Sequence, residues 1–175
     1  YKEQIKYLLE MFFQSRFIIY KKVCNHKTVK SIELMMGEVL QNLEPTFKIN
    51  KSIKDSDWEK FCTFSDTIVH SLDFLGENLQ ENKDAFYLYN RIKSRDIYKL
   101  IEELVVYDEE LCDKTISELN LKYNDPNNEY IINKSVIRYY SDEYPILVDE
   151  NDSIVLEHFF KNKGQDIYLI KVFQK

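Results

Sequence analysis

Two clusters of basic residues carry the side chains in this sequence that are best suited to chemistry. The first cluster consists of Arg16, Lys21, Lys22, His26, Lys27 and Lys30. The second consists of Arg91, Lys93, Arg95 and Lys99. Arginine recognises phosphate through planar, bidentate hydrogen bonds, and lysine adds a point charge. Both clusters are therefore candidate phosphate sites. A solvated surface is the alternative for each, because cations near a helix end also suit the helix dipole.

Residues for direct catalysis are hard to find. No Gly-rich phosphate loop is present, because the three glycines stand alone. The three histidines are far apart, and none is followed by aspartate. No Cys-x-x-Cys pair indicates a structural zinc site. The three cysteines are expected to be buried thiols rather than nucleophiles, namely Cys24, Cys62 and Cys112.

Composition narrows the class of protein further. A chain of 175 residues suits one domain or two small ones. A net charge of −6 disfavours nucleic-acid binding, although 13 Tyr and 11 Phe could stack on single-stranded bases. No apolar run is long enough for a membrane span, and charged residues interrupt any signal-peptide layout. The odd cysteine count and wide spacing favour a reducing, intracellular location, cytoplasmic or nuclear. The first residue, Tyr1, suggests a fragment.

The first half of the chain has the apolar periodicity of helices. We expect helices over residues 2–24, 28–43, about 57–75 and 81–94. Pro45 should end the second of these at Glu44, because the residue before proline avoids the helical region. Ser56 or Asp57 is a good N-cap for the third, and Gly76 is a plausible C-cap.

The second half has the pattern of short strands with one helix. We expect strands at 97–106, 130–140, 144–148, 153–160 and 167–173, and a short helix over 108–119. The segment 124–128 is the strongest turn signal. The predicted class is α+β, with a helical N-terminal half followed by a small, mostly antiparallel sheet. The predicted parts are 1–94, helical, and 95–175, regulatory and oligomerising.

Several motifs, in order, resemble one family. The motif Phe13-x-x-Arg16-x-x-x-Tyr20-x-x-Val23-x-x-His26-Lys27 resembles the helix after the catalytic core in HD-domain deoxynucleoside triphosphate triphosphohydrolases. The likeness is closest to the sterile-alpha-motif and HD-domain dNTPase of animals. It continues in Asp57-x-x-x-Phe61-x-x-Phe64-Ser65-Asp66-x-Ile68 and in Arg95-Asp96-Ile97-Tyr98-Lys99-Leu100, and more loosely at 155–160 and 169–172.

This resemblance implies a role for individual residues. Arg16 matches an arginine that contacts the substrate triphosphate, and Cys24 and Asn25 take the places of a Tyr-Gln pair lining the deoxyribose pocket. Residues that match allosteric nucleotide contacts between subunits are Lys2, His26, Lys27, Arg95, Ile97, Lys99 and either Lys161 or Lys163. The segment 95–99 matches one that reaches across a dimer to an activating guanine nucleotide.

Departures from the family pattern matter as much. The metal-binding histidines and the His-Asp pair that name the family are absent from this chain. The resemblance therefore implies a catalytically incomplete C-terminal half, with no cofactor of its own, from a parent that holds a divalent metal elsewhere. Where the family has Tyr and Gln, this chain has Cys24 and Asn25, so the pocket loses an aromatic side chain and has a shorter amide. In the family this wall excludes ribose sterically, so the resemblance does not imply strict selection of deoxyribose here.

The implied partners are nucleoside triphosphates (GTP or dNTP), the missing catalytic half and further copies of the chain in a homo-oligomer. The alternative is a nucleotide-sensing or protein-interaction module that has lost the HD chemistry. Binding of nucleic acid is not expected as the primary role.

Overall fold

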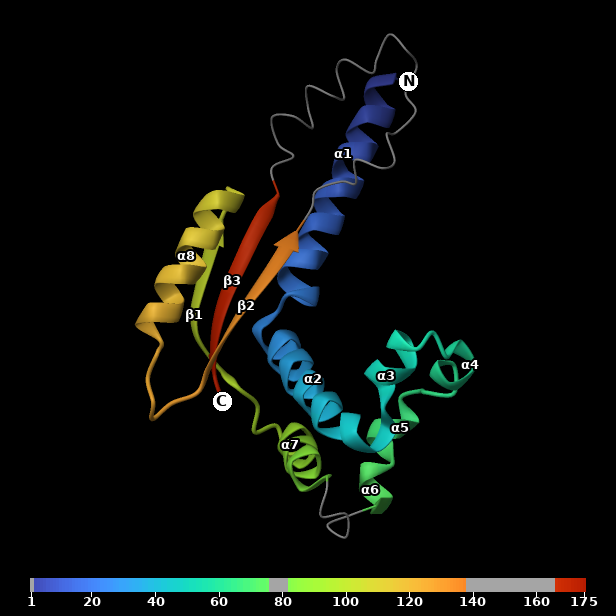
Figure 1. Cartoon of the computed structure of the whole chain (residues 1–175). Coiled ribbons are helices and arrows are strands. Elements are labelled where there is room, and N and C mark those ends of the chain that lie inside the picture. The colour runs from blue at the N-terminus through green and yellow to red at the C-terminus, as the bar shows by residue number, and fades with distance from the viewer. Residues whose placement is uncertain (1, 76–81, 138–165) are drawn as a thin grey trace. The chain divides into compact units, whose positions relative to one another are not determined.

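A computed structural model describes residues 2–75, 82–137 and 166–175 (Figure 1). Its helices are α1 Lys2–Ile19, a π-helix Tyr20–Cys24, α2 Lys27–Phe47, α3 Ile49–Lys54, α4 Trp58–Phe61, α5 Thr67–His70, α6 Leu72–Leu75, α7 Lys83–Lys93 and α8 Glu109–Lys122. Its strands are β1 Lys99–Val106, β2 Tyr130–Ile137 and β3 Ile167–Gln174. Helices come first and a sheet follows, so the predicted α+β class is confirmed.

The chain forms two compact units. Unit 1 contains residues 1–29 and 99–175, and unit 2 contains residues 30–98. This division differs from the expected boundary between residues 94 and 95, because α1 belongs with the sheet rather than with the later helices. The predicted parts 1–94 and 95–175, as functional regions, stay a prediction.

The sheet of unit 1 has the strand order β1-β3-β2, and both pairings are antiparallel. The last strand of the chain, β3, is therefore central. Its residues from Ile167 to Phe173 are all buried, as expected for a central strand whose two faces are both covered. The expected strands at 144–148 and 153–160 lie outside the described residues.

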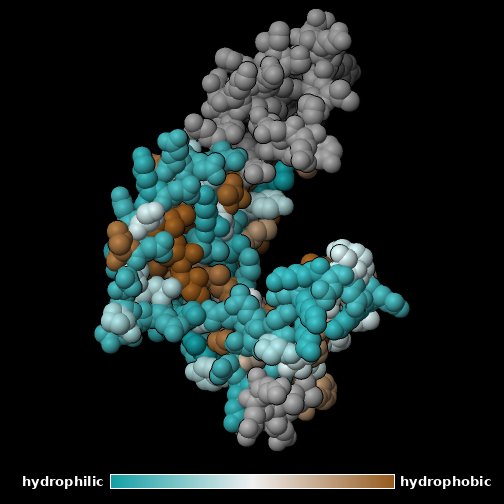
Figure 2. Space-filling model, viewed as in Figure 1, coloured by the Kyte–Doolittle hydropathy of each residue, from teal (hydrophilic) through white to brown (hydrophobic). Residues whose placement is uncertain are grey.

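Each face of this sheet has its own helix (Figure 1). On one face, Tyr168, Ile170 and Val172 pack with residues of α8 that include Cys112 and Leu119. Figure 2 shows hydrophobic side chains gathered where α8 and the sheet meet. On the opposite face, Ile137, Ile167 and Leu169 pack with Phe17 of α1. The alternation of side chains along β3 assigns odd-numbered residues, Lys171 among them, to the α1 face.

Unit 2 is a small helical core. Val39 and Leu43 of α2 pack with Leu72 of α6 and with Ala85 and Tyr89 of α7. Tyr98 also joins this unit: its hydroxyl donates to Glu38, and its backbone oxygen accepts from the hydroxyl of Ser31 at 2.9 Å. No helix among the described segments has the length and hydrophobicity to cross a membrane.

The expected stop at Glu44 is wrong, because α2 continues through Pro45 to Phe47. Proline removes a single N–H donor from the helix, and the groups beyond it find partners. The N–H of Lys48 donates to the Glu44 carbonyl at 2.8 Å, and the N–H of Asn50 donates to the Glu44 carboxylate at 3.0 Å. A left-handed conformation at Lys48, with φ 58°, then ends the helix.

The expected long helix over 57–75 is also wrong, because this stretch forms three single-turn helices. Asp57 does act as the predicted N-cap, since its side chain accepts the N–H of Lys60 at 3.1 Å. Hydroxyl groups then compete for backbone partners. Thr63 donates to the Lys60 carbonyl and Ser71 to the Ile68 carbonyl, both at 2.6 Å. Gly76, the proposed C-cap, lies outside the described residues.

The elements around 97–137 agree with their predictions. The strand expected at 97–106 is β1, and the strand expected from 130 is β2. The expected helix at 108–119 is α8, and Asp108 caps it by accepting the N–H of Leu111 at 2.8 Å. The turn at 124–128 is closed by Asp125, whose carboxylate accepts the N–H of Asn127 at 2.9 Å.

Candidate functional site

Arg16 lies in the last turn of α1, where its side chain is exposed. The four-residue spacing predicts that Arg16 neighbours Tyr20, and the guanidinium carbon is 5.3 Å from the centre of the Tyr20 ring. Stacking on an aromatic ring orients the flat guanidinium and leaves its N–H edge free to bind a planar or tetrahedral anion. The geometry suits a phosphate contact.

The π-helix Tyr20–Cys24 directly follows. One backbone oxygen, that of Tyr20, accepts both the N–H of Asn25 at 3.0 Å and the Asn25 side-chain amide at 2.9 Å. This wide turn is rare and occurs often at functional sites. It separates the two predicted pocket residues, because Cys24 is exposed whereas Asn25 is only 6% exposed. Asn25 thus serves the turn itself, and its predicted deoxyribose contact stays a prediction.

His26 and Lys27 are exposed at the start of α2. The Nδ1 atom of His26 accepts the N–H of Thr28 at 3.3 Å, which assigns the ring proton of the neutral form to Nε2. These two residues lie between the C-terminal end of the π-helix, where the helix dipole favours cations, and the N-terminus of α2, which favours anions. We call residues Cys24 to Lys27 the first turn.

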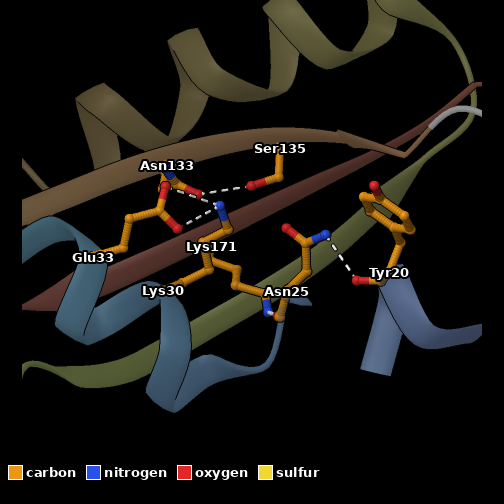
Figure 3. Close-up of polar contacts among 7 residues, drawn as sticks. All are labelled: Tyr20, Asn25, Lys30, Glu33, Asn133, Ser135 and Lys171. Atoms are coloured by element: carbon orange, nitrogen blue, oxygen red, sulfur yellow. Dashed lines mark hydrogen bonds and ion pairs between the residues drawn. The ribbon is translucent and has the colours of Figure 1, made fainter. Parts of the chain in front are cut away.

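Lys171 was not anticipated as a functional residue. Its Nζ donates to the backbone oxygen of Asn25, the same residue that closes the π-helix (Figure 3). Its Nζ is also 3.8 Å from the Glu103 carboxylate. The only signal in the sequence is one lysine inside the apolar run of the last strand, which is easily taken for an exposed edge position.

The second basic cluster separates into two kinds of cation. Arg91 and Lys93 have structural partners: Arg91 Nε is 2.9 Å from Asp96, and Lys93 Nζ is 2.6 Å from Asp73. The hydrogen bond from Lys93 is the main cause that lowers the pKa of Asp73. Arg95 and Lys99, the two that match the family motif, are exposed.

A tight turn carries Arg95. The N–H of Arg95 donates to the Ile92 carbonyl at 3.1 Å, and the N–H of Asp96 donates to the Arg91 carbonyl at 2.9 Å. Arg95 itself is left-handed, with φ 61°, a region that a non-glycine residue rarely adopts. The guanidinium carbon of Arg91 is also 5.5 Å from the centre of the Tyr98 ring, so Arg91 contacts a residue beyond the end of the turn. We call residues Arg91 to Asp96 the second turn.

The remaining predicted residues are distributed as follows. Arg95 and Ile97, which is half-buried, belong to unit 2, whereas Lys99 is the first residue of β1 in unit 1. Lys2 lies in α1. Lys161 and Lys163 lie outside the described residues. The structure thus brings Arg16 close to the first turn along one continuous segment of unit 1.

The cysteines correct one expectation. Cys112 is buried, and burial raises the pKa of its thiol. Cys24 and Cys62 are exposed rather than buried, because Cys24 ends the π-helix and Cys62 follows the single-turn α4. Within the described segments, no three His, Cys, Asp or Glu side chains gather in a way that could hold a metal ion.

Comparisons with known proteins place this geometry in context. No family model matches the sequence. The chain is 30% identical over 151 residues to an HD domain-containing protein of Acanthamoeba polyphaga mimivirus, covering 78% of this chain and 33% of that protein. It is 27% identical over 100 residues to a protein of Dictyostelium discoideum named as a deoxynucleoside triphosphate triphosphohydrolase, SAMHD1 homolog, covering 57% of this chain and 19% of that protein.

The chain therefore spans about a third and about a fifth of the lengths of these two relatives. A particular likeness to the animal enzyme stays a prediction. The chain is thus similar to one protein named for an HD domain and to one named as a dNTP triphosphohydrolase homolog.

Proposed function

We propose that this chain is the C-terminal, catalytically incomplete part of an HD-type dNTP triphosphohydrolase, which converts a dNTP to a deoxynucleoside and triphosphate. Arg16 contacts the substrate triphosphate. Arg95, Ile97 and Lys99 contact an activating nucleotide bound by another copy of the chain, and Lys2, His26 and Lys27 contribute to the same allosteric binding. The relatives' names and the family motifs support this assignment.

The observation that carries the proposal is the division of the second basic cluster. The two cations outside the family pattern are paired with carboxylates of unit 2, Arg91 with Asp96 and Lys93 with Asp73, although Lys93 is also exposed. The two cations inside the pattern, Arg95 and Lys99, are exposed. A merely solvated surface gives no reason for this division, whereas a phosphate contact requires accessible guanidinium and ammonium groups.

The backbone of Arg95 supports the same role. A left-handed conformation costs an L-residue about 1–2 kcal/mol, and glycine would avoid that cost. Arg95 follows the C-cap of α7 as Lys48 follows the end of α2, so the conformation belongs to a helix end, and what supports a role is that an exposed arginine rather than glycine occupies it. The first turn adds a second source of support, since His26 and Lys27 are exposed at the N-terminus of a helix of 21 residues.

These contacts give a physical reason for nucleotide-dependent assembly. A nucleotide held by residues of two subunits binds only the assembled state, so it shifts the equilibrium toward the oligomer. By the same linkage, assembly raises the affinity for nucleotide. The described side chains do not form a metal site. We therefore assign no step of the hydrolysis itself to this chain, and we expect the chain alone to be inactive.

The test uses the complete protein that carries this sequence. Arg16→Ala should reduce dNTP hydrolysis at least about a hundredfold, because it removes a charge-assisted contact to the triphosphate. The double variant Arg95→Ala, Lys99→Ala should lose assembly driven by GTP or dNTP. Release of triphosphate and sedimentation velocity with and without nucleotide measure the two effects.

A matched control is Lys93→Ala, which removes a cation of the same cluster and breaks its pair with Asp73. This variant should hydrolyse and assemble normally. Unchanged assembly in the Arg95, Lys99 double variant would show that the activating site is wrong. A wild-type protein that binds nucleotide without hydrolysing it would instead favour the sensing module.

A further inference from the structure

Lys171 occupies an unusual position in unit 1. It lies in the middle of β3, the central strand, and is only 2% exposed among buried apolar neighbours. Burying an ammonium group is costly unless it is paired and hydrogen-bonded. A hydrophobic side chain of similar length would avoid this cost at a position of this kind. Packing of the sheet alone therefore does not explain a lysine here.

The neighbours of Lys171 come from three directions. In the sheet register, Glu103 of β1 and Asn133 of β2 stand opposite Lys171 on its two sides. The Glu103 carboxylate is 3.8 Å from Nζ and supplies the opposite charge. Across the α1 face of the sheet, Nζ donates to the backbone oxygen of Asn25. The lysine thus links the most central strand to a residue 146 positions earlier.

Asn25 connects Lys171 to the first turn, because it bonds to both Lys171 and Tyr20. Its backbone and side-chain N–H groups both donate to the Tyr20 carbonyl, which sets the π-helix. Its own carbonyl is held by Lys171 (Figure 3). Cys24 precedes Asn25 directly and His26 follows it, so these two side chains are aimed by the conformation of Asn25. A freed Asn25 carbonyl would be buried without this donor, which favours a rearranged turn.

We propose that Lys171 is a positioning residue that holds the first turn, Cys24 to Lys27, in its π-terminated conformation. This part of the proposal concerns the turn and is independent of any ligand. Its consequence rests on the proposed function: by holding the turn, Lys171 sets the affinity for the nucleotide that the turn contacts. Lys171 itself does not touch the nucleotide, because it lies beneath the backbone of Asn25.

The first readout is hydrogen exchange of the Asn25 and His26 amides, whose N–H groups bond to Tyr20 and Val23. Lys171→Met keeps the length of the side chain and removes its donor. It should speed exchange of these amides about tenfold, as expected for loss of one buried charged hydrogen bond. The matched control is Lys134→Met, on the neighbouring strand β2, which removes a lysine paired with Asp113 at 2.9 Å. It should leave these amides unchanged.

The second readout is the steady-state kinetics of the complete protein with a dNTP. Lys171→Met should raise the activation constant, the nucleotide concentration that gives half-maximal activity, about tenfold and change kcat less, because the first turn contacts the allosteric nucleotide and does not react. Lys134→Met should change neither constant. If Lys171→Met does not fold, Glu103→Gln replaces it: that variant weakens the charge pair at an exposed side chain. It should give a smaller change in exchange in the same direction.

The outcomes test separately whether Lys171 holds the first turn and whether that sets the affinity for nucleotide. Unchanged exchange in a folded Lys171→Met variant overturns the proposal. Faster exchange with an unchanged activation constant shows that Lys171 holds the turn, and it overturns the consequence for nucleotide affinity. If the wild-type protein binds no nucleotide, the proposed function fails, and exchange of the turn alone decides whether Lys171 holds it.

Discussion

The two turns that carry the candidate nucleotide contacts are held in opposite ways. The first turn depends on Lys171, which is 146 residues from Asn25 along the chain. The second turn depends on its own members, since Arg91 and Asp96 form an ion pair only five residues apart. The first turn therefore requires the sheet of unit 1 to have formed, whereas the second turn requires only the contacts at the end of α7.

This difference predicts how each turn responds to damage. A non-local contact disappears with the element that supplies it, here the central strand β3. A local contact persists through partial opening, because its partners stay close whatever the rest of the chain does. Stability of the first turn should follow the sheet, and stability of the second should follow the helices of unit 2.

The largest expected effect comes from Ile170→Ala. Ile170 is fully buried beside Lys171 in β3, and a large-to-small change at such a site costs about 2–5 kcal/mol. Urea denaturation should measure this loss, and hydrogen exchange should rise at Asn25 and stay low at Asp96. Leu43→Ala, in the core of unit 2, is the matched control and should give the reverse pattern. Equal loss at both turns in either variant would mean that the two units unfold as one.

Removal of helix caps should give the next largest effect. Asp108→Ala removes the N-cap of α8 and should lower the free energy of unfolding by about 1 kcal/mol. Asp57→Ala removes the same kind of cap from α4, a helix of four residues that buries no side chain, and should cost less. The midpoint of urea denaturation checks both variants. A larger loss at Asp57 would contradict the idea that α8 stabilises unit 1 through its packing on the sheet.

A smaller gain in stability is expected from Arg95→Gly. Glycine adopts the left-handed conformation freely, so relief of the backbone should stabilise the folded state by up to about 1 kcal/mol, reduced by the greater entropy of the unfolded chain. Thermal denaturation measures the gain. The same variant should lose nucleotide-dependent assembly, since it removes the guanidinium.

Lys48→Gly is the control for this trade-off, because Lys48 has φ 58° at the end of α2 and no predicted nucleotide role. It should gain similar stability and assemble normally. Loss of assembly in Lys48→Gly, or its persistence in Arg95→Gly, would remove the functional explanation for the left-handed arginine.

The smallest effect concerns pH, with one carboxylate in each unit, the partly exposed Glu102 and the exposed Asp73. A hydrogen bond from Lys122, then one from Tyr123, lowers the pKa of Glu102 in unit 1, and Lys93 is the main cause that lowers the pKa of Asp73 in unit 2. Each folded pKa lies below the unfolded value of about 4. Their stabilisation is therefore present above that pH and is lost as pH falls through the folded pKa.

In Glu102→Gln, the melting temperature should fall less steeply as the pH is lowered into the acid range. Asp73→Asn should have the same effect through unit 2. Both effects should be small and should shrink in salt, because exposed pairs are screened. Differential scanning calorimetry from pH 3 to 7, monitored at low and high salt, checks this. A steeper acid limb in either variant would contradict the sign.

Much of the fold could be predicted because its signals are local. The caps Asp57 and Asp108 and the turn at Asp125 rest on side chains that bond to backbone within three residues. Periodicity located α7, α8 and the strands β1, β2 and β3. Two errors share one cause: the continuation past Pro45 and the breaks after Phe61 depend on competing hydrogen bonds whose balance a pattern of apolar residues does not record.

For the site, residue types and spacing nominated the two basic clusters as phosphate candidates, since phosphate recognition needs particular side chains. The family resemblance then singled out Arg16, the first turn and the pair Arg95 and Lys99. Residue types alone do not tell Arg95 from Arg91, because both are arginines four residues apart, and only folding pairs Arg91 with Asp96. Residue types and spacing also do not identify Lys171 as a residue of the site. Its partner at Asn25 is brought close by the antiparallel pairing of β3 between β1 and β2, and such long-range pairing leaves no local trace in the order of amino acids.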